Sequence, residues 1–146
     1  MQIWYKIVPF QYLQVTYKSL VDWKWTTDRL HCNPSFHGHE RYDHVKEGNN
    51  HFFACLLHLF QITVGTQSHA FAYVKTYGRP QGAMQRKDKD LGIYQLQLKI
   101  SPYQIISLDS VVRGALIVQD PENSHNYLIV DTIDTDMFLR MKMLVF

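Results

Sequence analysis

The sequence is poor in cysteine, in net charge and in glycine-rich stretches, and each shortage excludes a class of protein. Two cysteines among 146 residues, Cys32 and Cys55, are too few for a disulfide framework, and we expect both to be free thiols. A formal net charge of +2 argues against a general nucleic-acid coat but leaves room for a local basic patch. The seven glycines are scattered, so no glycine-rich phosphate cradle precedes a helix.

Long hydrophobic runs are also missing. The longest apolar-rich stretch, residues 51–64, contains two histidines, a glutamine and a threonine, so it is too short and too polar to cross a bilayer. The first six residues lack the charged region and apolar run of a signal peptide, and we expect none. We therefore predict an intracellular protein with no membrane partner.

The residues that are present favour a packed domain. Hydrophobic residues make up 46% of the chain and aromatic residues 14%, which is far more than a disordered chain contains. A chain of this length is near the commonest domain size and buries roughly two thirds of its unfolded surface. We expect residues 1–146 to form a single domain.

Short strands separated by turn residues dominate the middle of the chain. Residues 51–64 and 69–77 predict a long hairpin around the turn at 65–68, with the first strand bent or bulged. A buried helix at 51–64 is the alternative, but the second half of that run is β-branched and aromatic, which favours a strand. Further strands are predicted at 91–100, 105–108, 114–118 and 127–130.

The two ends of the chain differ from this β core, which spans residues 48–130. Residues 1–47 read as an extended arm that packs on the core without forming a regular layer, with candidate strands at 12–17 and 41–45. Residues 131–146 predict a short terminal helix at Thr135–Met143, capped by Asp134 or Thr135. The predicted fold class is mainly β: a small twisted β-barrel with an N-terminal extended arm and a short C-terminal helix.

Neither metal nor catalytic chemistry has a matching motif. Histidine and cysteine suit zinc, but the spacing of His31, Cys32, His37, His39 and His44 matches no standard zinc pattern. The cluster Asp131, Asp134 and Asp136 lacks the glycine and glutamate of a calcium loop, and helix capping explains it more simply. There is no Gly-x-Ser-x-Gly elbow, and Cys55 lies in an apolar run. We predict no enzyme, no metal and no cofactor.

Two aromatic or basic features are candidate ligand contacts. The polar loop at residues 79–89 is locally basic and is flanked by two tyrosines. The candidate ligand-binding residues are Tyr77, Arg79, Arg86, Lys87, Lys89 and Tyr94. Most such loops are simply solvated, and contact with phosphates is the alternative. Trp23 and Trp25 are typical of core or arm anchors, with an aromatic ligand cage as the alternative.

Several strings of residues resemble a known group of proteins. They are LHCNPSFHG at 30–38, RYD at 41–43, HFFA at 51–54, KDKDLG at 87–92, VRGAL at 112–116 and VDTIDTDMFLR at 130–140. Together they are similar to segments of large basidiomycete fungal proteins linked to mobile elements of the Kyakuja-Dileera-Zisupton and Plavaka transposon type. The resemblance covers most of the chain from Tyr17 onward, and it implies a nuclear piece of such an element. Transposase catalytic carboxylates cannot be placed.

The order of predicted parts also resembles, more remotely, a bromo-adjacent homology domain. Residues 77–80, Tyr-Gly-Arg-Pro, stand where that family has an aromatic-Arg-Pro step. Such domains are β-rich modules that bind chromatin and proteins. Thr76 and Gly78 stand where cage aromatics are expected, so the resemblance implies an interaction role without methyl-lysine recognition.

The expected function is therefore a non-catalytic interaction module derived from a fungal mobile element. Its expected partner is a protein or chromatin in the nucleus. The alternative is a DNA-binding module that uses residues 79–89, and a small hydrolase or metal enzyme ranks last.

Overall fold

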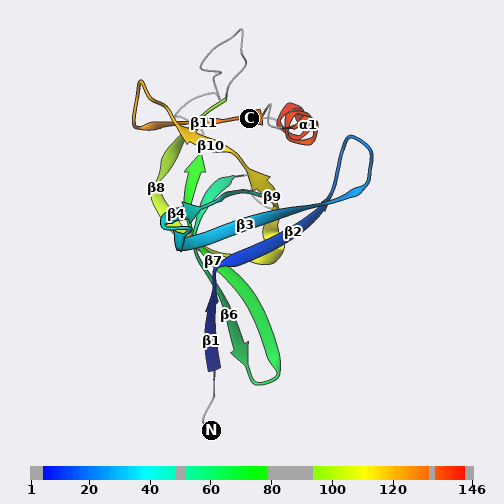
Figure 1. The fold of residues 1–146 in the computed structure, drawn as a ribbon, viewed down its shortest axis with the longest axis vertical. Helices are drawn as coiled ribbons and strands as arrows, with labels where there is room; N and C mark the ends of the chain where they lie inside the picture. Colours follow the sequence, from blue (N-terminus) through cyan, green and yellow to red (C-terminus); the bar gives the residue numbers. More distant parts are fainter. Residues whose placement is uncertain (1–4, 49–51, 79–93, 132–133, 144–146) are drawn as a thin grey trace.

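The computed structural model describes residues 5–48, 52–78, 94–131 and 134–143, and strands account for most of them (Figure 1). The strands are β1 (Tyr5–Phe10), β2 (Tyr12–Lys18), β3 (Trp25–Phe36), β4 (His39–Tyr42), β5 (His44–Glu47), β6 (Phe53–Val64), β7 (Gln67–Gly78), β8 (Tyr94–Ser107), β9 (Val111–Ala115), β10 (Ile117–Gln119) and β11 (Asn126–Ile129). The 3₁₀ turn η1 (Leu108–Ser110) precedes β9, and the helix α1 spans Thr135–Met143.

The larger sheet curls into a nearly closed antiparallel barrel of seven strands. Their order is β10-β11-β8-β7-β6-β5-β9, and β1 joins outside this path by pairing with the second half of β6. Figure 1 shows β1 and the β6–β7 hairpin projecting away from the barrel, while α1 lies near β10 and β11 at the other end. The predicted class, mainly β with a small barrel and a short C-terminal helix, is confirmed.

The β6–β7 hairpin follows the prediction closely. Phe53 pairs with Tyr77 at one end and Val64 with Gln67 at the other. Gly65 turns the chain with a φ of 63°, a value that glycine adopts at little cost. The register shifts between Leu56 and His58, which is the predicted bulge in the first strand.

The N-terminal segment is more regular than an extended arm. β2, β3 and β4 form a three-stranded antiparallel sheet of their own, and β5 belongs to the barrel. The run at 30–38 contains the turn residues Asn33, Pro34 and Gly38, yet it lies largely within β3. Its register shifts between Asn33 and Phe36, so the Asn33-Pro34 pair marks a bulge within a strand that stays paired.

Two strand boundaries also differ from the prediction. β8 is one continuous strand of 14 residues, although 91–100 and 105–108 were expected to be separate. Its register against β7 shifts between Lys75 and Tyr77, so an irregularity near Pro102 interrupts the pairing without ending the strand. The predicted strand at 114–118 is instead the end of β9 and most of β10, which part at Leu116.

Two hydrophobic clusters lie on opposite faces of the barrel sheet. Side chains of a strand alternate between faces, and along β6 Ala54 and Leu56 join the first cluster while Phe53 and Cys55 join the second. The first cluster receives Val15, Leu30 and Cys32 from β2 and β3. The second receives Ile117, Ile129, Met137 and Met141 from β10, β11 and α1. The N-terminal sheet and the C-terminal helix therefore cover opposite faces.

The start of α1 follows the predicted capping. Asp134 Oδ1 accepts a hydrogen bond of 2.7 Å from the backbone N–H of Met137, three residues on. Asp136 lies in the first turn, where the helix dipole favours a negative charge. The capping carboxylate and the two buried methionines fix the helix over the second cluster.

Candidate binding surface

Of the two predicted tyrosines, Tyr77 is a core residue and Tyr94 is partly buried beside the core. Tyr77 on β7 is only 2% exposed, and its ring lies 4.7 Å from the ring of Tyr127 and 5.8 Å from that of His44. Burial raises the pKa of its hydroxyl. Tyr94, the first residue of β8, packs against the same second cluster. Both tyrosines therefore lie in one region of the fold, where they pack against other side chains.

The basic residues of the predicted site, Arg79, Arg86, Lys87 and Lys89, lie outside the described residues. Their proposed contact with phosphates stays a prediction.

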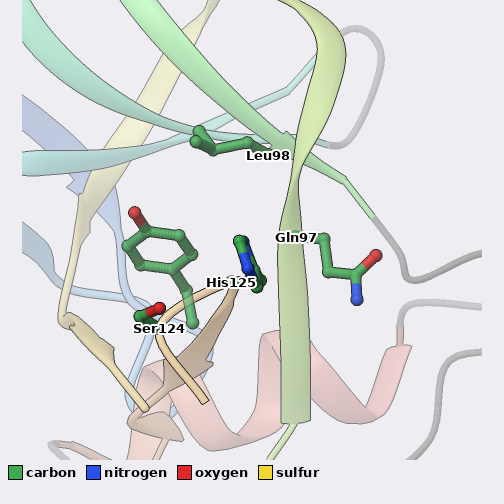
Figure 2. A pocket seen from close by; sticks show the side chains of 5 residues that line it. Gln97, Leu98, Ser124 and His125 are labelled. Carbon is green, nitrogen blue, oxygen red and sulfur yellow. The ribbon is translucent and has the colours of Figure 1, made fainter. Parts of the chain in front are cut away.

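A hollow borders Tyr127, whose ring centre lies 4.7 Å from that of Tyr77. Its volume is about 230 Å³, and it is lined by Gln97, Leu98, Ser124, His125 and Tyr127. In Figure 2, Gln97 and Leu98 on β8 lie across from Ser124 and His125 of the β10–β11 connection. Sites for drug-sized ligands begin at roughly 300 Å³, so this hollow is small for one. The Gln97 amide already donates a hydrogen bond to Asn126 Oδ1 at 2.9 Å.

A buried arginine joins three distant parts of the chain. Arg113 on β9 is 3% exposed, and it donates hydrogen bonds to Asp134 from both terminal nitrogens and to Asp136 from one, at 2.7–3.0 Å. Its guanidinium lies 4.9 Å from the ring centre of Tyr17 on β2. Asp136 also accepts a hydrogen bond from Arg140 within α1. The network ties α1 to β9 and to the β2–β3 hairpin.

The carboxylates that suggested a cation site are therefore held by arginines. Burial alone would raise the pKa of Asp134, but hydrogen bonds from Arg113 and the Met137 N–H lower it below its ordinary value. The pKa of Asp136 is likewise lowered, with Arg140, the Leu20 N–H and Arg113 as donors against the effect of burial. Both groups are fixed as structural anions at the helix start.

The two cysteines are buried, free and unactivated. Burial raises the pKa of Cys32 to about 11 and also raises that of Cys55. A thiolate is the reactive form of cysteine, and these surroundings disfavour it. Both residues therefore act as small core side chains.

The histidine-rich stretch forms an aromatic cluster. The His31 ring lies 4.5 Å from the Phe36 ring and 5.4 Å from the Tyr12 ring. Its Nδ1 atom is buried without a hydrogen-bond partner and lies 3.6 Å from Asp43 Oδ2. Within residues 5–48, 52–78, 94–131 and 134–143, no group of three or more ligand side chains is placed to hold a metal ion.

One face of the projecting hairpin carries several exposed apolar side chains. Directly paired residues of antiparallel strands share a face, so the pairings of β1, β6, β7 and β8 define it. We call this surface the open face. Its members are Tyr5, Ile7, Pro9, His58, Phe60, Ile62, Val64, Gln67, His69, Phe71, Tyr73, Lys75, Tyr103, Ile105 and Ser107. Tyr5 is 70% exposed, Tyr103 57% and Ile105 62%, values far above those of core side chains.

Aromatic rings on the open face stack across the strands. One row runs from His58 on β6 to Tyr73 on β7 and on to Tyr103 on β8. Its ring centres are 6.1 and 5.9 Å apart, and the two tyrosine rings are within 14° of parallel. A second row pairs Phe60 with Phe71 at 5.9 Å. The rings of each row therefore pack against one another, and His58 and Tyr103 at the ends of the first row are exposed.

The strands of the open face carry no negative side chain. β1, β6, β7 and β8 contain no aspartate or glutamate, whereas they contain Lys6, Lys75 and Lys99 together with His58 and His69. Lys75 lies on the open face opposite Tyr103, whereas Lys6 pairs with Thr63 and lies on the opposite face of the sheet. This surface is aromatic and can only be neutral or positive.

The tryptophans Trp23 and Trp25 lie at the tip of the β2–β3 hairpin. They are 65% and 71% exposed, so the expectation that they anchor the core is wrong. Trp23 has a φ of 61° in the turn, and the ammonium of Lys18 lies 5.9 Å from its ring centre. Charges of both signs surround this tip, which distinguishes it from the open face.

Comparison with protein-family models, with curated proteins and with solved structures finds no match to this chain. In the part of the chain that the structure describes, no helix has the length and apolar character needed to traverse a bilayer. The properties of the surface itself therefore carry the functional argument.

Proposed function

We propose that this protein is a non-catalytic interaction module that binds a macromolecular partner through the open face. The observation that carries the proposal is the set of exposed apolar residues on β1, β6 and β8, among them Tyr5, Tyr103 and Ile105, with half-buried rings of β7 between β6 and β8. A monomeric soluble protein seldom exposes a contiguous apolar surface of this kind unless something binds there. Tyrosine and phenylalanine are also enriched at the centres of interfaces.

The non-catalytic part of the proposal rests on the described reactive groups. The thiols of Cys32 and Cys55 are buried with raised pKa values, and Asp134 and Asp136 are held by arginines. A chromatin or protein partner and a nuclear location are the expectations carried by the family resemblance.

Binding to the components of chromatin tests the proposal. Fluorescence anisotropy would measure affinity for histone octamers, mononucleosomes, duplex DNA and single-stranded DNA. The double variant Tyr5→Ala/Tyr103→Ala removes two exposed rings from the open face. We expect it to weaken binding of at least one component by more than about 10-fold, since a well-packed interface aromatic contributes 2 kcal/mol or more.

A matched control lies on the opposite face of the same hairpin. Ser68 is exposed and Thr63 half-buried there, and their hydroxyls hydrogen-bond to each other at 2.8 Å. The variant Thr63→Ala/Ser68→Ala should bind like the natural protein. The proposal would be overturned if the two variants bound each component equally strongly, or if the natural protein bound none of the components.

A further inference from the structure

We infer that two copies of this chain pair along the outer edge of β1, antiparallel and centred on Ile7, so that their two larger sheets become continuous. The inference goes beyond the proposed function and does not depend on what the open face binds. It rests on the free edge of β1, on the direction of the backbone groups along that edge, and on the residues that limit the register.

β1 forms an outer edge of the larger sheet, beside the projecting hairpin (Figure 1). Among the described strands, β6 is the only one that pairs with β1. The residues Tyr5 to Pro9 are all exposed, and the exposed fractions of Tyr5, Ile7 and Val8 are 70%, 56% and 39%. An exposed apolar edge strand presents unpaired backbone N–H and C=O groups, which makes it a template for another strand.

The turn of the β6–β7 hairpin determines which backbone groups of β6 face β1. Val64 and Gln67 flank a two-residue loop that begins at Gly65, so they form a hydrogen-bonded pair between β6 and β7. Hydrogen-bonded and non-bonded positions alternate along an antiparallel strand. The backbone groups of Thr63, and of every second residue before it up to Leu59, therefore face β1.

The backbone groups of Tyr5, Ile7 and Pro9 consequently face away from β6. Thr63 pairs with Lys6, so Lys6 and every second residue after it bond to β6, and the residues between them do not. Pro9 agrees with this assignment, because proline has no N–H and here falls where β6 requires no donor. The free edge thus offers the N–H groups of Tyr5 and Ile7 and the C=O groups of all three residues.

These groups match those of a second copy of the same strand. When Ile7 lies opposite the second copy's Ile7, the two residues exchange both of their hydrogen bonds, and each Tyr5 N–H donates to the C=O of the other copy's Pro9. The side chains of Tyr5, Ile7 and Pro9 share the open face. The pairing therefore sets Ile7 against Ile7 and Tyr5 beside Pro9, and apolar cross-strand pairs of this kind stabilise a sheet.

Lys6 and Pro9 disfavour the neighbouring registers. A shift that sets Tyr5 opposite Ile7 also brings Lys6 opposite the second copy's Lys6, and like charges directly opposite each other are destabilising. The reverse shift sets Ile7 opposite Pro9 and leaves the Ile7 C=O without a donor. In the centred register Lys6 lies opposite Val8, and both β1 edges are used, so the assembly closes as a two-fold dimer. Because β1 itself meets these constraints, they favour a second copy over an unrelated extended segment.

A contact along one strand is small, so we expect a weak dimer. β1 has six residues and spans about 20 Å. Interfaces that bury less than about 1,200 Å² in total are typical of transient complexes. The dimeric fraction of the full chain should therefore rise with protein concentration, and sedimentation equilibrium in the analytical ultracentrifuge measures it.

Disulfide capture tests the register. In the proposed dimer the two Ile7 Cα atoms are about 5.5 Å apart, within the range that a disulfide spans. Ile7→Cys should therefore form a covalent dimer under mild oxidation, detected by gel electrophoresis without reductant. Tyr5→Cys is the matched control on the same edge and face, because the two copies of Tyr5 lie more than about 13 Å apart in this register. We expect it to cross-link at least about 10-fold less, and the natural protein, whose cysteines are buried, not to cross-link.

Two substitutions of Ile7 separate backbone pairing from side-chain contact. Ile7→Pro removes the outward N–H and spares the hydrogen bonds to β6, whereas Ile7→Ala shortens the side chain and keeps the N–H. We expect the dissociation constant of the Ile7→Pro dimer to be at least about 10-fold higher than that of Ile7→Ala, because each copy loses a hydrogen bond across the interface. Circular dichroism shows whether each variant is folded, and disulfide capture decides the question if the proline variant is not.

Three results would each overturn the inference: a natural protein that stays monomeric at every concentration, equal cross-linking of Ile7→Cys and Tyr5→Cys, or equal dissociation constants for Ile7→Pro and Ile7→Ala. A monomeric protein whose binding to histone octamers is lost in Ile7→Pro would assign the edge to an extended segment of a partner protein instead. The proposed function fails on a different measurement. A monomer that binds chromatin components through the open face would refute the dimer alone, and a dimer that binds none of them would refute the proposed function alone.

Discussion

The same face of the β6–β7 hairpin is core at one end and open at the other. Near the barrel, Phe53 and Tyr77 are 1% and 2% exposed within the second cluster. Further along, Phe60, Phe71 and Tyr73 lie on the same side of the strands and are only half-buried. Aromatic residues alternate in the same way at both ends, so the residue types do not explain why only one end is buried.

The difference is the cover that distant segments provide. Met137 and Met141 of α1, Ile129 of β11 and Ile117 of β10 all pack on the barrel end of this face. Those elements come from the last third of the chain. Neither of the two hydrophobic clusters includes a residue of the open face. A strand pattern therefore specifies which side chains share a face, and long-range packing decides whether that face becomes core or interface.

We expect the largest loss of stability from a substitution that weakens the attachment of α1 to the barrel. Arg113→Ala removes the arginine that holds Asp134 and leaves Asp136 with Arg140 as its cationic partner at the start of α1. Breaking a buried ion pair on one side costs about 3–5 kcal/mol, because a desolvated charge remains. We expect the free energy of unfolding, measured by urea denaturation, to fall by that amount.

Arg41→Ala is the control for this prediction. Arg41 pairs with Asp43 at 3.3 Å, but its side chain is 41% exposed, so its loss should cost less than about 1 kcal/mol. Similar losses of stability for the two arginine variants would mean that the Arg113 network does not hold α1 against the barrel.

The second prediction compares the two ends directly. Phe53→Ala removes a fully buried ring from the covered end and should lower the free energy of unfolding by about 3–5 kcal/mol. Tyr103→Ala removes a ring that is 57% exposed at the open end and should cost less than about 1 kcal/mol. Equal costs in urea denaturation would show that the open face is part of the core, and the distinction between the ends would disappear.

Local signals made part of this fold predictable. The hairpin turn follows from Gly65, the two-residue alternation of 69–77 defines two faces, and Asp134 with Asp136 marks the start of α1. Each of these rests on residues close in sequence. The bulge within β6 was also foreseeable, because a long strand that leaves a barrel must bend.

Long-range pairing explains what sequence reasoning missed. Asn33-Pro34 has turn chemistry, yet β3 continues through it because β4 pairs on the far side of a bulge. Arg113 lies 21 residues before Asp134, and no pattern links them. Tyr77 and Tyr103 look equally available in the sequence. Only the position of α1, β10 and β11 shows that Tyr77 is covered and Tyr103 is open.

The third prediction concerns acid stability at the covered end. The pKa of His44 is lowered to about 4, chiefly by burial; nearby Asp43 opposes this shift and Lys75 adds to it. An unfolded histidine titrates near 6.5, so between these values the unfolded chain binds more protons than the folded one. The contribution to stability is complete above pH 6.5 and is lost as the pH falls toward 4. We expect a loss on the order of 2–3 kcal/mol over this interval.

His44→Phe tests that origin, because a phenyl ring fills the site without titrating. Urea denaturation between pH 7.5 and 4.5 should show a shallower pH dependence for the variant than for the natural protein. This interval stays above the range in which Asp134 and Asp136, whose pKa values are lowered, take up protons. An unchanged slope would assign the acid sensitivity to another group.

We expect the smallest loss of stability in the turn at the end of the projecting β6–β7 hairpin. Gly65 has a φ of 63°, and a Cβ added there would meet no atom within 4 Å, so only backbone strain opposes a side chain. Gly65→Ala should lower the free energy of unfolding by about 1 kcal/mol, whereas Gly65→Asn should cost less, since asparagine tolerates this conformation. Equal costs in urea denaturation would mean that strain at the turn is not the cause. A cost as large as that of Phe53→Ala would mean that the projecting hairpin contributes to global stability as much as the covered end does, which its uncovered face does not predict.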